Sequence, residues 1–190
     1  SNPEVLAIVT SNVLARIRED PSAKYYGVSQ NDTEAHCTCA TCAAVNAYEE
    51  SGAGTVIRFV NAVAETVEKE FPAAVIETLA YRYSSKPPKH VRVRKNVMPC
   101  FCTFKCEFSK PLGTSPYPAN RAIARDLSGW KKMCHNLYVW DYTTDFRNYL
   151  FPFPNVFVMR ENCRFSRDNG VVCLYEQGGC QGRHASFAEL

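Results

Sequence analysis

The stretch TVIRFVNAVAETVEKEFPAAVIETLAY, residues 55–81, holds one helix and one strand and decides the fold class. Its first part repeats apolar residues at spacings of three and four, with charged residues opposite, which predicts an amphipathic helix over residues 55–71. Pro72 ends that helix. Residues 75–81 are then rich in apolar and β-branched side chains, which predicts a buried strand. The stretch therefore predicts a helix that leads directly into a strand of a covered sheet.

The same alternation of helix and strand continues on both sides of this stretch. Apolar periodicity and the positions of proline and glycine predict helices over residues 5–20, 37–50, 120–132 and 156–168, and strands over residues 25–29, 96–102, 137–142 and 171–175. Strands that alternate with helices form a parallel sheet whose faces the helices cover. We therefore predict an α/β fold, specifically a parallel (β/α) TIM-type barrel.

The number of predicted strands is too small for a complete barrel, because eight strands with their helices take about 250 residues. We expect a partial barrel comprising the later five strands, formed by residues 1–190 as a single domain and completed by upstream strands of a longer parent chain. The first residues, which have neither an initiator Met nor a basic leader, agree with this expectation. A doubly wound open sheet is the structural alternative, but no glycine-rich phosphate loop follows the first predicted strand.

Composition and charge exclude several classes of protein. A chain of 190 residues with 46% hydrophobic residues can bury a core and is expected to be globular. Its 22 basic and 19 acidic residues are spread along the chain, so the net charge of +3 does not indicate nucleic acid as a partner. No apolar run reaches the roughly 18 to 20 residues that span a bilayer. We therefore expect a soluble chain with no membrane span.

Carboxylates lie at the ends of three of the predicted strands. Asp32 follows the first strand, Asp141 lies at the end of the fourth, and Glu176 follows the fifth. Because the carboxyl ends of parallel strands meet at one edge of a sheet, we expect these acids to share a pocket. Glycoside hydrolysis uses such acids, one to protonate the leaving oxygen and another to stabilise or attack the sugar. The alternative is that each acid caps a following helix, and Glu34 competes with Asp32 for the role.

Aromatic side chains accompany these acids. Trp140 and Tyr142 flank Asp141, and Tyr81 ends the strand predicted over residues 75–81. Flat aromatic faces suit the apolar faces of sugar rings. Alternate residues of a strand point to opposite faces of the sheet, so ordinary core packing is the alternative role for Trp140.

Six short motifs occur in order along nearly the whole chain. They are Ser29-Gln30-Asn31-Asp32 with the following Cys37-x-Cys39-x-x-Cys42, Phe59-Val60-Asn61-Ala62-Val63-Ala64, Leu79-Ala80-Tyr81 before Lys86-Pro87-Pro88-Lys89, Trp140-Asp141-Tyr142, Pro152-Phe153-Pro154-Asn155, and Tyr175-Glu176-Gln177-Gly178. Together they resemble the family labelled domain of unknown function 4838, part of which is classed as glycoside hydrolase family 163. The resemblance implies a (β/α)-barrel catalytic domain in a larger secreted or periplasmic bacterial protein. It also implies an endo-β-N-acetylglucosaminidase that acts on complex N-glycans.

The resemblance further implies hydrolysis by substrate assistance, in which the acetamido oxygen of the sugar attacks the anomeric carbon. That mechanism needs one protein acid for the leaving group and one polar or acidic group to orient the acetamide. We predict Asp32 and Glu176 as the chief catalytic residues, with Asp141 joining them or positioning a sugar hydroxyl. The predicted substrate-binding residues are Asn31, Tyr81, Trp140, Tyr142 and Gln177. The alternative function is a non-catalytic carbohydrate-binding or cysteine-bridged interaction module.

The ten cysteines include two compact clusters that hydrolysis does not need. Four thiolates drawn from both clusters can hold a structural zinc ion, whereas disulfides suit an exported compartment. Buried free thiols are the third alternative, and they suit Cys134, Cys163 and Cys173 on apolar segments. Hydrolysis itself calls for no cofactor. The two clusters consist of Cys37, Cys39 and Cys42, and of Cys100, Cys102 and Cys106.

Overall fold

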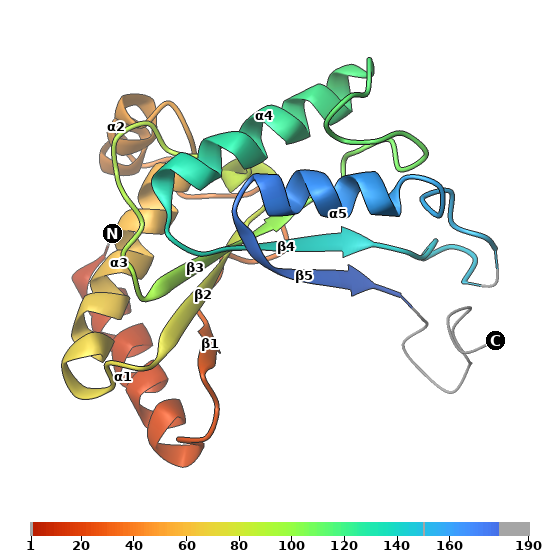
Figure 1. Cartoon of the computed structure of the whole chain (residues 1–190). Helices are drawn as coiled ribbons and strands as arrows, with labels where there is room; N and C mark the ends of the chain where they lie inside the picture. Colours follow the sequence, from red (N-terminus) through yellow and green to blue (C-terminus); the bar gives the residue numbers. More distant parts are fainter. Residues whose placement is uncertain (1, 150, 179–190) are drawn as a thin grey trace.

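The computed structural model describes residues 2–149 and 151–178 of the chain (Figure 1). Within these residues helices and strands alternate largely as the sequence predicts. In chain order the elements are α1 (Pro3–Glu19), β1 (Tyr25–Gly27), α2 (Ala40–Tyr48), α3 (Ala53–Glu70), β2 (Val75–Ala80), the 3-10 turn η1 (Arg82–Ser84), β3 (Val97–Cys102), α4 (Pro118–Met133), β4 (Leu137–Tyr142), α5 (Met159–Asp168) and β5 (Val171–Gln177).

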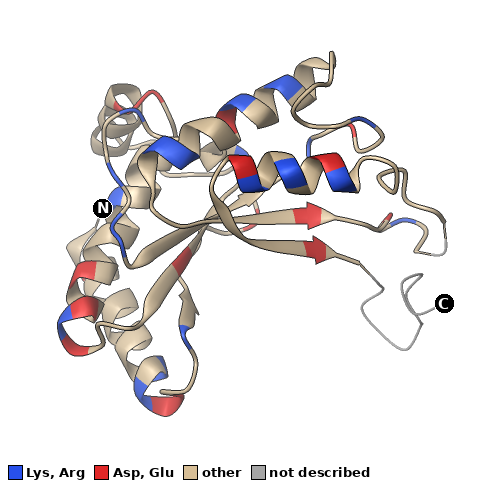
Figure 2. Cartoon of the chain, in the orientation of Figure 1, with Lys and Arg blue, Asp and Glu red and all other residues tan. Residues whose placement is uncertain are grey.

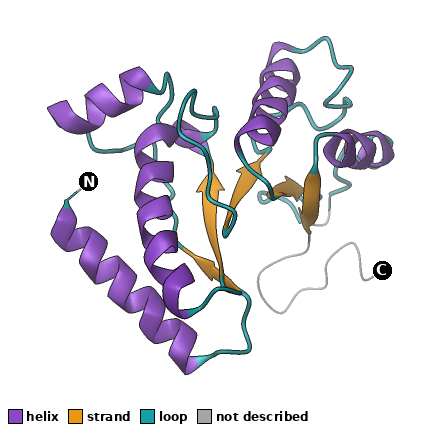
Figure 3. Ribbon diagram, turned by 60° about the vertical axis from the view of Figure 1, so that its left-hand side comes forward, coloured by secondary structure: helices purple, strands orange, loops and turns teal. Residues whose placement is uncertain are grey.

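The five strands form one parallel sheet in the order β1-β2-β3-β4-β5. Each strand lies beside the one that precedes it in the chain, so the strand order never reverses. A doubly wound open sheet needs such a reversal, which makes it the wrong alternative. The sheet instead curls into a half-barrel (Figures 1 and 3). The α/β class is confirmed, and the curvature and strand order are consistent with a partial barrel.

Helices cover one face of the half-barrel and enclose the hydrophobic core (Figure 3). The amphipathic face of α3 contributes Val63 and Val67, which are fully buried and pack in one core with Ile76 of β2 and Phe101 of β3. Trp130 of α4 belongs to the same core. Complete burial of an aliphatic side chain contributes about 1.5–3 kcal/mol, so the α3 face is a main source of stability. No helix within residues 2–149 and 151–178 covers the opposite, concave face of the sheet.

The connection from β2 to β3 crosses the sheet without an α-helix, and a buried carboxylate holds it in place. Glu49, at the end of α2, is fully buried and accepts the backbone N–H groups of His90 (2.7 Å) and Val91 (2.9 Å). The guanidinium of Arg58 donates to its other oxygen at 2.5 Å. Burial alone would raise the pKa of Glu49, but the Val91 and His90 N–H groups and Arg58 outweigh it and lower that pKa. The loop therefore depends on this one ionised side chain.

Two predicted boundaries differ from the structure at the ends that approach the concave face. The first strand ends at Gly27 rather than at residue 29, because the chain then turns to follow Gln30, whose amide donates to the Tyr81 carbonyl at 2.8 Å. The helix predicted over residues 156–168 begins at Met159, and residues 154–158 form turns. The other helices and strands lie within a few residues of their predicted ranges.

Charged residues of both signs are scattered over the helices and loops (Figure 2). Among the described residues, no helix combines the length and apolar character that crossing a membrane requires. Figure 2 also shows acidic residues near the ends of β4 and β5, which are Asp141 and Glu176 by their positions in these strands.

Candidate functional site

Strand geometry sorts the predicted site residues onto two faces of the sheet. Side chains alternate between the faces along a strand, and in-register neighbours on adjacent strands share a face. Tyr142 pairs in register with Gln177, and Asp141 pairs with Glu176. In β4, Asp141 shares the buried, helix-covered face with Val139 of the core. Tyr142 and Gln177 therefore lie on the concave face, whereas Asp141 and Glu176 lie on the convex one.

A cavity of about 350 Å³ lies on the concave face at the carboxyl ends of the strands. Residues from segments far apart in the sequence converge on it, which is the position expected of a ligand site in a parallel α/β fold. It brings together five of the eight predicted site residues. We call it the aromatic pocket; its lining residues are Asp32, Leu79, Tyr81, Cys102, Trp140, Tyr142, Phe146 and Gln177.

The walls of the aromatic pocket are fixed by contacts among their own side chains. The indole N–H of Trp140 donates to Oε1 of Gln177 at 2.8 Å, and the Trp140 ring meets Tyr175 edge-on with centroids 5.2 Å apart. Tyr142 meets Phe146 edge-on at 6.0 Å. Rings held in this way present preorganised flat faces to a ligand, so binding costs little side-chain ordering.

Asp32 is the carboxylate of the aromatic pocket. Nε of Arg82 donates to its Oδ1 at 2.8 Å. The Arg82 guanidinium first, and the Tyr81 hydroxyl second, hold the pKa of Asp32 below its usual range. Asp32 is therefore ionised at neutral pH and serves as an acceptor or a negative charge. It is not suited to donate a proton.

Arg82 is a site residue that sequence reasoning missed. It adopts a left-handed backbone conformation, with φ of 51°, which is uncommon for a residue other than glycine. Its guanidinium lies over the rings of Tyr81 and Phe104, at 5.0 and 5.5 Å from their centroids. The sequence could have indicated Arg82, because it is a charged residue directly after the predicted strand end at Tyr81. No sequence feature indicates Phe146, because its place in the pocket wall depends on how the loop after β4 folds back.

Asn31 and Glu34 lie near the aromatic pocket without lining it. The carbonyl of Asn31 accepts the N–H of Thr33 at 2.8 Å, in the turn that presents Asp32. Glu34 forms longer ion pairs, at 3.7 Å with Arg82 and 3.5 Å with Lys105. Glu34 therefore belongs to a charged rim around Asp32.

Asp141 and Glu176 form a separate carboxyl pair on the convex face. Asp141 is 5% exposed and accepts a hydrogen bond of 2.5 Å from the hydroxyl of Thr103. Burial raises the pKa of Asp141. Burial first, and the nearby Asp141 second, raise the pKa of Glu176 to about 7. One carboxyl oxygen of Glu176, Oε2, is buried without a hydrogen-bond partner. The three predicted acids thus divide between two locations, because strand alternation turns neighbouring residues to opposite faces.

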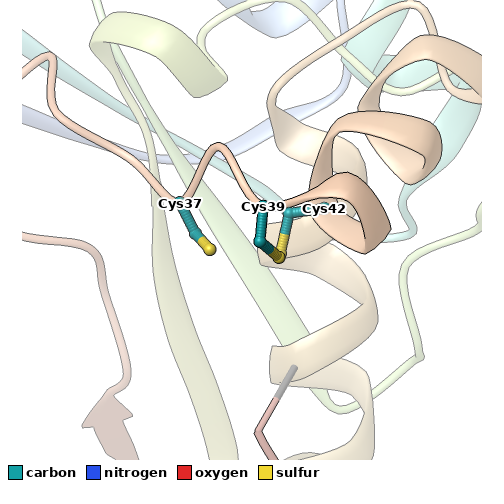
Figure 4. A group of neighbouring side chains, drawn as sticks. All are labelled: Cys37, Cys39 and Cys42. Carbon is teal, nitrogen blue, oxygen red and sulfur yellow. The ribbon is translucent and has the colours of Figure 1, made fainter.

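Three cysteine side chains converge beside the first predicted strand end (Figure 4). We call Cys37, Cys39 and Cys42 the cysteine triad; their sulfur atoms all lie within 4.8 Å of one another. The N–H of Cys42 and the two neighbouring thiols lower the pKa of Cys39 to about 7, and the same thiols raise the pKa of Cys42 to about 11. A cluster of this kind can bind a metal ion.

The other cysteines do not join the triad in the described part of the chain. Cys100 and Cys102 are buried in β3, and no metal-binding group there combines them with the triad. The nine described cysteines are free thiols, and Cys180 lies outside the described residues. Cys163 and Cys173 are exposed, contrary to the predicted burial. Cys173 pairs in register with Tyr138 and therefore lies on the concave face of the sheet.

The sequence model of the family described as Domain of unknown function (DUF4838) matches residues 1–190. The chain belongs to this family. No curated protein and no solved structure matches it. The DUF4838 match covers both the aromatic pocket and the cysteine triad, whereas the resemblance to glycoside hydrolase family 163 rests on the sequence motifs alone.

Proposed function

We propose that this DUF4838 domain binds a sugar ring in the aromatic pocket and belongs to a glycoside hydrolase. The observation that carries the proposal is the pocket itself, in which Tyr81, Trp140, Tyr142 and Phe146 surround one carboxylate and one amide. Sugar rings have apolar faces that stack on aromatic side chains, and hydroxyl groups that bond to carboxylates and amides. The motif resemblance to glycoside hydrolase family 163 supports an endo-β-N-acetylglucosaminidase that acts on complex N-glycans.

The two classes of acid suit the two roles of substrate-assisted hydrolysis. Asp32, ionised through Arg82, suits the group that orients the acetamide or stabilises positive charge at the anomeric carbon. Glu176, with a pKa of about 7, suits the proton donor at neutral pH. Glu176 follows Tyr175 in β5 and lies on the convex face. Proton donation in the pocket therefore requires the end of β5 to rearrange so that Glu176 faces the sugar. Asp141, hydrogen-bonded to Thr103, then acts through Glu176 by raising its pKa.

A non-catalytic carbohydrate-binding module is the second candidate function. The separation of Asp32 from Asp141 and Glu176 favours it, because binding needs only the aromatic pocket whereas hydrolysis needs a proton donor at the sugar. Both candidates share the same ligand and differ in turnover.

The fold and the cysteine triad lead to two further proposals, one about the parent protein and one about a metal ion. We propose that the half-barrel is part of a TIM-type barrel in a larger secreted or periplasmic protein, with further strands as its partner. Sequential parallel strand order supports this, as does the pairing of β1 and β5 on one side only among the described residues. We also propose a zinc ion at the cysteine triad, which would brace the turn that carries Asp32.

Hydrolysis is tested with a complex N-glycan and the full-length parent protein. We expect Asp32→Asn and Glu176→Gln each to lower kcat by at least about 100-fold, which is the range of electrostatic stabilisation for Asp32 and of general acid catalysis for Glu176. The control is Glu34→Gln, which changes a rim carboxylate and is expected to retain activity near that of the wild type. Near-wild-type rates for both Asp32→Asn and Glu176→Gln would refute the catalytic assignment.

Binding is tested separately through tryptophan fluorescence. The chain has two tryptophans, and Trp130 is buried with its N–H donated to the Ser85 carbonyl at 2.7 Å, so only Trp140 lies in the aromatic pocket. An N-acetylglucosamine oligosaccharide is expected to change the emission of the wild type and not that of Trp140→Phe. Binding that survives neutralisation of all three acids, in a parent protein without hydrolase activity, would establish the binding module instead.

A further inference from the structure

A second large cavity lies apart from the aromatic pocket and shares no lining residue with it. It has a volume of about 640 Å³, is partly open to the surface, and is bordered by α1, α3 and residues 28–42. Its wall is mainly apolar, and includes Val5, Val28, Val56, Phe59, Val60 and Tyr83. All three residues of the cysteine triad also line it. An apolar chamber with a few convergent polar atoms is the usual form of a small-molecule site.

The triad has the donors and spacing of a thiolate metal site. Its sulfur atoms lie within 4.8 Å of one another, and a zinc ion with Zn–S bonds of about 2.3 Å holds its sulfur ligands about 3.8 Å apart. Small side-chain rotations therefore close the site. Cys39 is the N-cap of α2, where the positive end of the helix favours a thiolate.

The triad supplies three of the four ligands that zinc requires. Among the described residues the group contains no fourth His, Cys, Asp or Glu donor. His36 precedes Cys37, but its Nδ1 lies 3.0 Å from the Glu34 carbonyl and its ring stacks on Tyr83 with centroids 4.7 Å apart. Structural zinc sites have four protein ligands, whereas sites with three protein ligands leave a position open for an external molecule.

We propose that Cys37, Cys39 and Cys42 bind one Zn²⁺ ion, and that the fourth coordination position opens into the 640 Å³ cavity and accepts an external ligand. The ligand is a thiol or an imidazole-type nitrogen carried on an apolar body, since the metal selects the donor atom and the cavity wall selects the body. On binding zinc, the thiols release their protons to solvent and no group is oxidised or reduced. This inference deepens the zinc proposed above and rests on it.

Zinc binding is measured first, on the full chain under a phosphine reductant that supplies no thiol. Competition with a chromophoric chelator is expected to give one Zn²⁺ per chain. Cys37→Ser, Cys39→Ser and Cys42→Ser should each weaken the affinity by at least about tenfold. The matched controls Cys163→Ser and Cys173→Ser change exposed cysteines elsewhere and should leave the affinity unchanged. Zinc binding that survives in the triple serine variant, or a disulfide within the triad of the unreduced chain, would overturn the zinc site.

The open position is measured next, with Co²⁺ in place of zinc as a spectroscopic probe. Imidazole is expected to shift the visible cobalt bands, and benzimidazole should bind on the order of tenfold more tightly because its second ring buries apolar surface. Phe59→Ala and Val56→Ala, which shorten the cavity wall, should each reduce that preference. Phe157→Ala, at a position 93% exposed, should not.

The two measurements separate the possible failures. A cobalt spectrum that neither imidazole nor benzimidazole alters would overturn the open position and leave the zinc site standing. Weaker cobalt binding in Cys180→Ser would also overturn the open position, because the fourth ligand would then come from the chain itself. Neither result bears on sugar hydrolysis, which the Asp32 and Glu176 variants test at the other pocket.

Discussion

Glu49 is a fully buried carboxylate, yet its pKa is lowered because the chain supplies it with donors. Two backbone N–H groups and Arg58 surround it, and the loop that connects β2 to β3 closes over it. Removal of its charge leaves the N–H groups of His90 and Val91 with a weaker acceptor inside the protein, where an unmatched donor is costly.

We expect Glu49→Gln to lower the free energy of unfolding by about 1–3 kcal/mol at pH 7. The control is Glu50→Gln, which removes an exposed ion pair with Lys89 and should cost at most about 1 kcal/mol. The folded pKa of Glu49 lies below its ordinary 4.5, so its ionised form stabilises the fold above pH 4.5 and this contribution is lost as pH falls through the lower value. Urea unfolding of both variants from pH 7 to pH 3 measures the difference, and equal losses at pH 7 would contradict the prediction.

The pKa of Glu176 is shifted in the opposite direction from that of Glu49, so its effect on stability has the opposite dependence on pH. Its pKa is raised to about 7, so the folded chain still holds this proton at pH values where the unfolded chain, near 4.5, has released it. As pH rises from 4.5 to about 7 the folded state loses stability, and the loss is complete above that. We expect Glu176→Gln to become more stable relative to the wild type between pH 4 and pH 8. Urea midpoints at both pH values test this, with the exposed Glu19→Gln as control; a difference that does not change with pH would contradict it.

Strand alternation also explains which site residues the sequence could predict. Trp140 and Tyr142 reach the aromatic pocket because they end a strand and share one face. The same rule turns Asp141 to the other face, so the pattern Trp-Asp-Tyr already contained the separation of the acid from its aromatic neighbours. Strand alternation does not place Arg82 or Phe146, since the conformation of the loops after β2 and β4 decides where they lie.

The packing of α4 against the β2–β3 connection depends on a glycine inside a helix. Glycine weakens a helix interior by about 1 kcal/mol relative to alanine, so Gly129 needs another reason to be there. A Cβ atom added at Gly129 would lie 2.6 Å from Cγ of Pro87, in a rigid ring. The close approach of the loop to the helix therefore requires a residue without a side chain. Local propensity alone could not have shown this.

A double-mutant cycle tests this contact. We expect Gly129→Ala to destabilise the wild type, because overpacking costs about 1–3 kcal/mol and exceeds the gain in helix propensity. In a Pro87→Ala background the ring is gone, and the same substitution should stabilise the fold by up to about 1 kcal/mol. Thermal and urea unfolding of the four chains give the coupling free energy. The same effect of Gly129→Ala in both backgrounds would contradict the contact.

The curvature of the half-barrel follows from strand order, which the sequence indicated through its alternation of elements. Right-handed crossovers that always advance to the next position place every helix on one face and leave the other uncovered. The aromatic pocket lies on that uncovered face. The covered face therefore carries the hydrophobic core, and the concave face carries the pocket that we propose as the sugar site. The count of strands and their parallel sense could be predicted. The helix-free crossover over Glu49 could not, because it depends on a tertiary contact between α2 and a distant loop.

Protection of backbone amides from hydrogen exchange should be greater in the central strands of this sheet than in its edge strands. β2, β3 and β4 are paired on both sides, whereas β1 and β5 each pair on one side among the described residues. Along a parallel strand the N–H groups point alternately to its two sides, so about half of those in an edge strand lack a strand partner. We expect amide hydrogen exchange to be slowest for β3 residues such as Phe101, which open only with the whole core, and faster for outward-facing amides of β1 and β5. Exchange of the isolated chain followed by NMR resolves these positions, with α3 as the internal standard for global unfolding. Outer-edge amides of β5 that exchange as slowly as those of β3 would mean that another strand covers this edge, and the half-barrel would then be incomplete as a description of the sheet.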